Sequence, residues 1–189
     1  DHEELYRYFN AMSLHGQSKD ALAKTQPGAW RYDVAFPGYK CNMTDLQAAI
    51  GLVELERFDR DTTPRRRAIC ERYSAAFAGD DRFVVPSFQT GDRESCFHLY
   101  MLRVPKATEE QRDAIITAIA KRGVSVNVHF IPLPKLSFYE GQGLRMVDYP
   151  NTYKLYSTEI SLPVYYDLTD DQVDTVVAAV KDAVAEVLG

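Results

Sequence analysis

Apolar residues recur along the chain at two spacings, which predict where helices and strands lie. In residues 1–14, Leu5, Phe9 and Met12 follow one another at helical spacing, so an amphipathic helix is expected there. The next fourteen or so residues are polar and contain Gly and Pro, which predicts a connecting loop. The string WRYDVAF at 30–36 is aromatic and β-branched, which predicts a strand or hairpin arm ending at a Pro-Gly pair.

The segment 44–78 predicts a long helix with an interruption. Thr44 is a suitable N-cap, and the apolar pattern runs from there to about Arg60. A proline inside a helix costs roughly 3 kcal/mol, so a restart is expected with Thr63 as N-cap and Pro64 at the first helical position. Either two abutting helices or one helix broken near Pro64 is predicted.

From residue 79 onward the pattern alternates between strands and helices. Strands are predicted at RFVVP (82–86), CFHLYMLRV (96–104), VSVNVHFI (124–131) and EISLPV (159–164). Helices are predicted from capping boxes at Thr108–Gln111 and Thr169–Gln172, with a short helix at 150–158. This order predicts a small α/β sandwich in which helices cover one face of a mainly antiparallel or mixed sheet.

Composition excludes several classes of partner. The net charge is -5, the isoelectric point is near 5.4, and no basic stripe is present, so nucleic acid is not expected. The three cysteines are far apart and lack a C-x-x-C pair, which argues against a disulfide scaffold and a zinc site and favours a reducing cytoplasm. No apolar run approaches the roughly 20 residues of a membrane span, so no membrane partner is expected.

The usual catalytic signatures are missing, and the first candidate site is a polar corner, PGYKCN, ahead of the helix at 44. Lys40 and Asn42 would suit an anion, because a cation, an amide donor and the free N–H groups of a helix N-terminus can converge on phosphate. The plainer alternative is a Pro-Gly turn leading into a capped helix, with Lys40 in solvent.

The second candidate is the segment HFIPLPKLSFYEGQG that follows the strand at 124–131. Alternation along that strand places three valines on one face and Ser125, Asn127 and His129 on the other. His129 is a candidate substrate contact, Lys135 an anion contact and Tyr139 a stacking surface; the plainer alternative is a strand histidine bonded to a loop. His98 is expected in the core. The arginines at 65–67 are expected on a solvated helix face, with an anion-binding cluster as the alternative.

Residues 28–58, GAWRYDVAFPGYKCNMTDLQAAIGLVELERF, resemble the DegT/StrS-type nucleotide-sugar aminotransferases. Three further stretches are similar to that family, in the same order: FHLYMLRV, RGVSVNVHFIPL and ISLPVYYDLTDDQVDTVVAAV. The resemblance covers essentially the whole chain. Two departures stand out, since many relatives have Asn and Arg where this chain has Lys40 and Asn42, and a histidine where it has Pro134.

The resemblance implies a fold and a cofactor. The fold is α/β: the C-terminal small domain of an aspartate aminotransferase-like (fold type I) enzyme, preceded by a tail of the large domain. Residues 1–43 would be that tail, 44–78 the linking helix and 79–189 the small domain. The cofactor would be pyridoxal 5'-phosphate, with its Schiff-base lysine upstream of this chain, so that no catalytic residue is expected here.

The resemblance also implies a reaction: transfer of an amino group from glutamate to a nucleotide-linked keto-sugar, in amino-sugar biosynthesis for a surface polysaccharide or glycan. The enzyme would be a homodimer whose corner residues Tyr39, Lys40 and Asn42 reach the cofactor in the neighbouring subunit. Substrate contacts are expected from Trp30, Arg31, His129 and Tyr139. The alternatives are a non-catalytic binding or dimerisation module, and a sugar dehydratase or regulator of the same fold.

Overall fold

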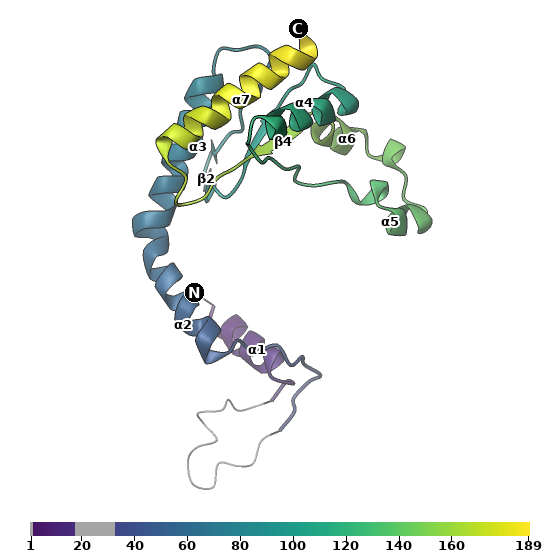
Figure 1. Cartoon of the computed structure of the whole chain (residues 1–189). Helices are drawn as coiled ribbons and strands as arrows, with labels where there is room; N and C mark the ends of the chain where they lie inside the picture. Colours follow the sequence, from purple (N-terminus) through teal and green to yellow (C-terminus); the bar gives the residue numbers. More distant parts are fainter. Residues whose placement is uncertain (1, 18–32) are drawn as a thin grey trace. The chain divides into compact units, whose positions relative to one another are not determined.

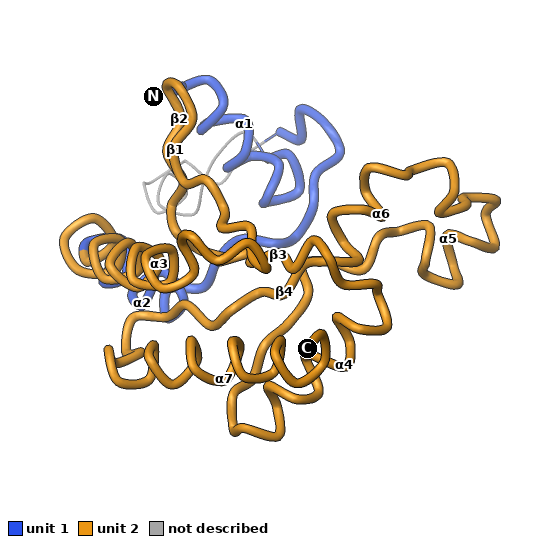
Figure 2. Tube along the Cα trace, turned by 90° about the horizontal axis from the view of Figure 1, so that it is seen from above, with its two compact units in different colours: residues 1–56 blue, residues 57–189 orange. Residues whose placement is uncertain are grey.

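The computed structural model describes residues 2–17 and 33–189, and the chain divides into two compact units, residues 1–56 and 57–189 (Figure 2). The α-helices, shown in Figure 1, are α1 (Glu3–Ser13), α2 (Asp45–Arg57), α3 (Thr63–Phe77), α4 (Glu109–Lys121), α5 (Ser137–Gly141), α6 (Pro150–Tyr156) and α7 (Asp170–Leu188). The strands are β1 (Gln89–Thr90), β2 (Arg93–Glu94), β3 (Tyr100–Arg103) and β4 (Glu159–Leu162). Short turns of helix lie at η2 (Phe58–Thr62), η3 (Leu133–Lys135) and η4 (Met146–Asp148).

In the first unit, the predicted helix at 1–14 is confirmed as α1. The N-cap predicted at Thr44 is also confirmed, because its hydroxyl accepts from the amide of Gln47 at 3.3 Å while the Gln47 side chain accepts from the amide of Thr44 at 3.0 Å. The predicted strand at 30–36 lies partly outside the described residues. Its described remainder, 33–36, makes a single antiparallel bridge, from Val34 to Gln17, rather than a continuous strand.

Helical backbone runs from Asp45 to Phe77 through the π-helical segment η2. Of the two predicted alternatives, one helix interrupted near Pro64 is confirmed, and α3 begins with Pro64 in its first turn. The N-cap expected at Thr63 is wrong, because Thr63 has ordinary helical dihedrals (φ -65°, ψ -46°) and its amide donates to the carbonyl of Phe58, five residues back. The π-helical turn explains why the helix continues past Pro64. A wider turn just ahead of Pro64 accommodates the missing N–H and the ring, which would otherwise clash with the preceding turn of an α-helix.

The second unit is built on an antiparallel pair of strands, β3 and β4, whose register sets Leu102 opposite Ile160 and Arg103 opposite Glu159. A single β-bridge adds to each outer edge of this two-stranded pair. Val84 pairs with Arg103 of β3, and Asn127 pairs with Ser161 of β4. The expected antiparallel pairing is confirmed among the described residues. The strands predicted at 82–86, 96–104 and 124–131 are too long, because their ends leave the ladder for loops.

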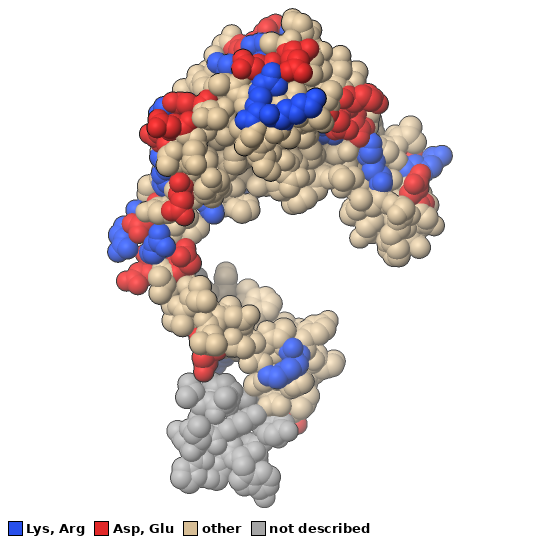
Figure 3. Space-filling view, viewed as in Figure 1, with Lys and Arg blue, Asp and Glu red and all other residues tan. Residues whose placement is uncertain are grey.

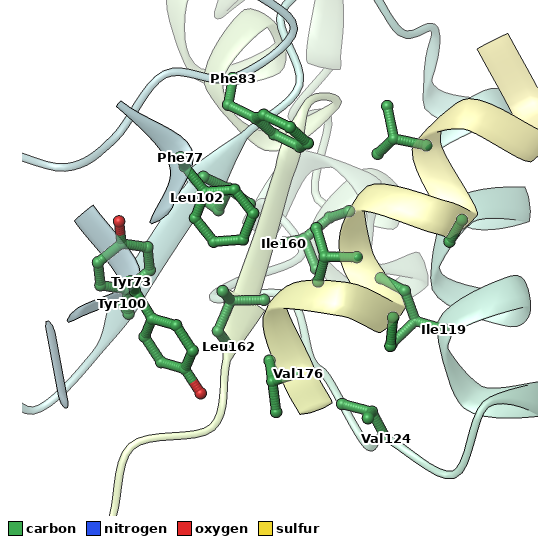
Figure 4. Packing of buried hydrophobic residues seen from close by; sticks show 14 of the residues in the cluster. Tyr73, Phe77, Phe83, Tyr100, Leu102, Ile119, Val124, Ile160, Leu162 and Val176 are labelled. Atoms are coloured by element: carbon green, nitrogen blue, oxygen red, sulfur yellow. The ribbon is translucent and has the colours of Figure 1, made fainter. Parts of the chain in front are cut away.

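Helices α3, α4 and α7 cover one face of this pair and enclose the core. Tyr100 and Leu102 of β3 are fully buried against them, whereas Met101 between them is 42% exposed. Figure 4 shows Ile160 and Leu162 of β4 pointing toward α7, with the aromatic rings of α3 and β3 beside them. The capping boxes predicted for α4 and α7 are both present.

On the second unit, acidic and basic side chains lie beside one another instead of forming separate patches. Figure 3 shows acidic and basic side chains side by side on the face in view. Arg72 of α3, for example, binds Asp174 of α7 through two hydrogen bonds of 2.6 and 2.8 Å. Among the described residues, every helix is too short or too polar to span a bilayer.

Candidate functional site

The polar corner of the first unit is fixed by backbone contacts with the end of α1. The amide of Tyr39 donates to the carbonyl of Met12 at 2.7 Å, and its carbonyl accepts from the amide of His15 at 2.8 Å. Gly38 lies so close to this segment that an added Cβ would be 2.3 Å from the amide nitrogen of Gly16. Only glycine fits there, so the Pro-Gly pair is explained by close packing as well as by the turn.

Lys40 and Asn42 are brought together at this corner. The Lys40 ammonium donates a hydrogen bond to the side-chain carbonyl oxygen of Asn42, and both residues are exposed just ahead of α2. The ammonium has three N–H groups, so two remain, and the Asn42 amide keeps its own N–H groups. A cation and an amide at the N-terminal end of a helix are the donor set that a phosphate group requires.

The other predicted residues of the first unit contribute less. The ring of Tyr39 is 70% exposed, so its backbone is held while its side chain is open to a ligand or another chain. Trp30 and Arg31 lie outside the described residues.

In the second unit, His129 belongs to a chain of hydrogen bonds that sequence reasoning missed. Its Nδ1 lies 2.7 Å from the hydroxyl of Ser161, which in turn donates to the carboxylate of Glu159. The backbone amide of His129 donates to the other oxygen of the same carboxylate at 3.0 Å. Ser161 and Glu159 are both buried, so these contacts replace water for each polar group.

Burial raises the pKa of Glu159, and the hydrogen bonds from Ser161 and from the backbone of His129 oppose that rise. When Glu159 is ionised it can only accept, so the Ser161 proton points toward it. The Ser161 oxygen then accepts from the Nδ1–H of His129, which leaves Nε2 of the imidazole as a free acceptor. The arrangement therefore selects one tautomer of His129.

His129 and Glu159 line an open cavity of about 620 Å³ on the face of β3 and β4 opposite the core, and α6 supplies part of its wall. Arg103, Met101, His129, Phe130, Leu155 and Glu159 are among the residues that line it. The sequence carried a signal for this face. In β4, the polar residues Glu159 and Ser161 alternate with Ile160 and Leu162, so they share the side opposite the core.

Two of the other candidates take structural roles. Lys135 binds both carboxylate oxygens of Glu109 at 2.6 and 2.7 Å, and Tyr156 donates to Glu109 at 2.9 Å. Lys135 is thus already paired, and the anion contact considered for it is wrong because a carboxylate of α4 holds its charge. Tyr139 lies in α5 against Phe138 and does not line the cavity beside His129.

Two expectations for basic residues need correction. His98 is exposed rather than in the core, because it precedes β3 where the chain is not yet paired with β4. The arginines at 65–67 are not simply solvated, since Arg65 binds Asp170 and Arg67 binds Glu94, each at 2.8 Å. These ion pairs fix α3 to its neighbours and give no support to an anion-binding cluster.

Comparison with known proteins places the whole chain in one group. Residues 1–181 match the DegT/DnrJ/EryC1/StrS aminotransferase family. The spore coat polysaccharide biosynthesis protein SpsC of Bacillus subtilis (strain 168) is 41% identical over 188 residues, covering 97% of this chain and 48% of that protein. The putative sugar aminotransferase Spr1654 from Streptococcus pneumoniae, in its PMP form, is 45% identical with a TM-score of 0.88, covering 100% of this chain and 47% of that one.

A more distant structure shares the fold alone. Helicobacter pylori PseC, an aminotransferase involved in the biosynthesis of pseudoaminic acid, has a TM-score of 0.78 at 19% identity, covering 98% of this chain and 47% of that one. The chain thus spans about half the length of these relatives and carries about half of their fold.

Proposed function

Because this chain belongs to the DegT/DnrJ/EryC1/StrS aminotransferase family, we propose that it is part of a pyridoxal-phosphate-dependent enzyme that moves an amino group from glutamate to a nucleotide-linked keto-sugar. The observation that carries this proposal is the similarity to Spr1654, a putative sugar aminotransferase, over the full length of the chain at 45% identity. The product would be an amino sugar for a surface polysaccharide or glycan, as the name of the SpsC relative suggests.

In this proposal the chain supplies the C-terminal half of a fold type I enzyme. Residues 1–43 complete the large domain, 44–78 form the linking helix and 79–189 form the small domain. The exposed apolar side chains of α2 support a partner surface, since Leu46, Ile50 and Leu55 are 81%, 69% and 72% exposed. A homodimer in which the corner enters the neighbouring subunit's active site would cover them.

The corner residues fit the cofactor. Lys40 and Asn42 would bind the phosphate of pyridoxal 5'-phosphate, because their contact leaves N–H donors on both side chains. Tyr39, with its exposed ring, would lie beside the cofactor or the substrate. When bound, the pyridine ring supplies the electron sink for amino transfer. The lysine that anchors it would come from the part of the enzyme outside this chain.

Substrate contacts would come mainly from the polar face of the small domain. His129, oriented by Ser161, can accept a hydrogen bond at Nε2. Trp30, Arg31 and Tyr139 remain predicted contacts on the strength of the family resemblance.

Cofactor binding by the protein in its full natural length tests the proposal. Lys40→Ala and Asn42→Ala should each weaken pyridoxal-phosphate binding about tenfold or more, the usual cost of a charge-assisted hydrogen bond. Lys121→Ala and Asn151→Ala, at exposed positions of α4 and α6, are matched controls and should bind normally. Unchanged affinity for pyridoxal phosphate in the Lys40 and Asn42 variants would mean that the corner is not part of the cofactor site. A full-length protein that binds no cofactor would favour the binding or dimerisation module.

A further inference from the structure

Two buried side-chain atoms of α3 have no hydrogen-bond partner among residues 2–17 and 33–189. They are the hydroxyl oxygen of Thr63 and Nε of Arg66. The two residues are three positions apart, so they lie on the same face of the helix. Buried polar groups in folded proteins are nearly always paired, so two unpaired atoms on one helix face call for an explanation.

Arg66 differs from the other arginines of this helical stretch. Each of the others in residues 57–72 binds a carboxylate: Arg57 and Arg60 bind Asp61, Arg65 binds Asp170, Arg67 binds Glu94 and Arg72 binds Asp174. Arg66 is half-buried, and in the part of the chain that the structure describes its guanidinium makes neither a hydrogen bond nor an ion pair. The charge of Arg66 is therefore not neutralised within these residues.

The charge of Arg66 acts on the core of the second unit. Burial raises the pKa of the Cys70 thiol to about 12, and the positive charge of Arg66 opposes that rise. Cys70 is fully buried and lies one turn further along α3, so water screens this charge only weakly. A cation in such surroundings is stabilised by a paired anion that also accepts its hydrogen bonds.

A carboxylate would satisfy both unpaired atoms. It carries the charge that balances Arg66, and it accepts hydrogen bonds from Nε and the other N–H groups of the guanidinium fork. Its oxygens have further lone pairs for the hydroxyl of Thr63. A water molecule or a backbone carbonyl could accept the same hydrogen bonds but would leave the charge unbalanced.

The occupant follows from the length of the relatives. This chain covers only 48% of SpsC and 47% of Spr1654, so in the proposed enzyme a comparable length of the same polypeptide lies outside it. We propose that Thr63 and Arg66 form a docking point on α3 for one Asp or Glu side chain of that outside part. The inference goes beyond the proposed function, which gives α3 no partner. It rests on that function only in treating this chain as part of a larger enzyme.

Urea unfolding of the full-length protein tests the docking point through the sign of the effect. Arg66→Met should raise the unfolding equilibrium constant about a hundredfold, because it leaves the docked carboxylate buried without a counter-charge. Thr63→Val removes one hydroxyl at similar volume and should raise it about tenfold, and it serves where Arg66→Met does not fold. Without a docked carboxylate the sign reverses, because each substitution would remove an unpaired buried atom. Arg60→Met, which breaks an exposed ion pair with Asp61, is the control and should change it little.

A zero-length cross-link identifies the occupant. In full-length Arg66→Lys, a carbodiimide should join the new amine to the docked carboxylate, and mass spectrometry of the peptides gives the partner. We expect a link within one polypeptide, from position 66 to an Asp or Glu outside the 189 residues of this chain. Arg65→Lys is the matched control and should be joined to Asp170, whose carboxylate lies 2.8 Å from the Arg65 guanidinium.

Unchanged or increased stability of both Arg66→Met and Thr63→Val would overturn the proposal. A link from position 66 to another residue of this chain, a link between two copies, or no link while the control reacts would overturn it too. None of these measurements needs the cofactor, so the docking point can fail while the corner variants still support an aminotransferase. The reverse outcome, a docked carboxylate in a full-length protein that binds no pyridoxal phosphate, would retain the docking point and reject the proposed function.

Discussion

The imidazole Nδ1 of His129 lies 2.7 Å from the hydroxyl of Ser161, two residues that are 32 positions apart in the sequence. The bridge between Asn127 and Ser161 brings their segments together at the edge of the strand pair. A buried carboxylate, Glu159, completes the contact and sets the direction of the Ser161 proton. The orientation of His129 thus depends on the strand pairing as well as on its own loop.

Removal of the Ser161 hydroxyl should destabilise the second unit. In Ser161→Ala, the Glu159 carboxylate and His129 Nδ1 each lose a partner, which we expect to cost about 1–3 kcal/mol. The free energy of unfolding in urea measures this. Ser137→Ala, at an exposed position of α5, is the control and should change it little. Equal stability of the two variants would mean that the buried contact contributes nothing to the fold.

Stability should depend on pH through Glu159. Burial raises its pKa above the usual 4.5, so the folded state binds this proton more tightly than the unfolded chain does. This contribution to stability is full below that value and is lost as the pH rises through the folded pKa. We therefore expect Glu159→Gln to gain in stability relative to the wild type from about pH 4.5 toward neutrality. A difference that stays constant over this interval would contradict the assignment.

The contact between Lys135 and Glu109 should hold the projecting segment that contains α5. Figures 1 and 2 show this segment extending away from α3 and α7. Because Lys135 and Glu109 have side-chain exposures of only 28% and 15%, Lys135→Ala should cost about 1 kcal/mol. Amide hydrogen exchange in η3 and α5 should speed up, whereas Lys154→Ala, at an exposed position of α6, should leave it unchanged. Equal exchange rates in the two variants would mean that the contact between Lys135 and Glu109 does not hold this segment.

Substitution of Gly38 tests the close packing of the corner, with Gly51 of α2 as the control position. Alanine at Gly38 would place its Cβ 2.3 Å from backbone, so Gly38→Ala should displace the corner and raise its susceptibility to proteolysis. Alanine at Gly51 meets nothing within 4 Å, and Gly51→Ala should stabilise α2 by about 0.5–1 kcal/mol. A proteolytic pattern at 36–44 that is unchanged by Gly38→Ala would contradict the close approach.

Sequence reasoning succeeded where the signal is local. The capping boxes of α4 and α7 each lie within a few residues, and both helices begin where Thr108 and Thr169 indicate. Strand lengths were overestimated because a ladder depends on a partner far along the chain. The alternation of the segment at 124–129 was nevertheless right, since Val124 is buried while Asn127 and His129 face β4 on its polar side.

For the candidate sites too, residues that are close in the sequence were identified, whereas residues brought together by the fold were not. Lys40 and Asn42 were identified from a contiguous string, and the structure joins them. Glu159 and Ser161 were missed although they alternate with apolar residues in β4, because the alternation does not show which segment lies beside them. Arg103 was missed because the register of β3 and β4 sets it opposite Glu159. Lys135 was misjudged for a related reason, since its partner Glu109 is 26 residues away.

The most direct test of the central claim is the visible absorbance of the full-length protein, recorded after addition of pyridoxal 5'-phosphate and again after addition of glutamate. We expect a cofactor band that glutamate bleaches and that a nucleotide-linked keto-sugar restores. Absence of a band, or a band that glutamate leaves unchanged, would contradict the assignment of this chain to a sugar aminotransferase.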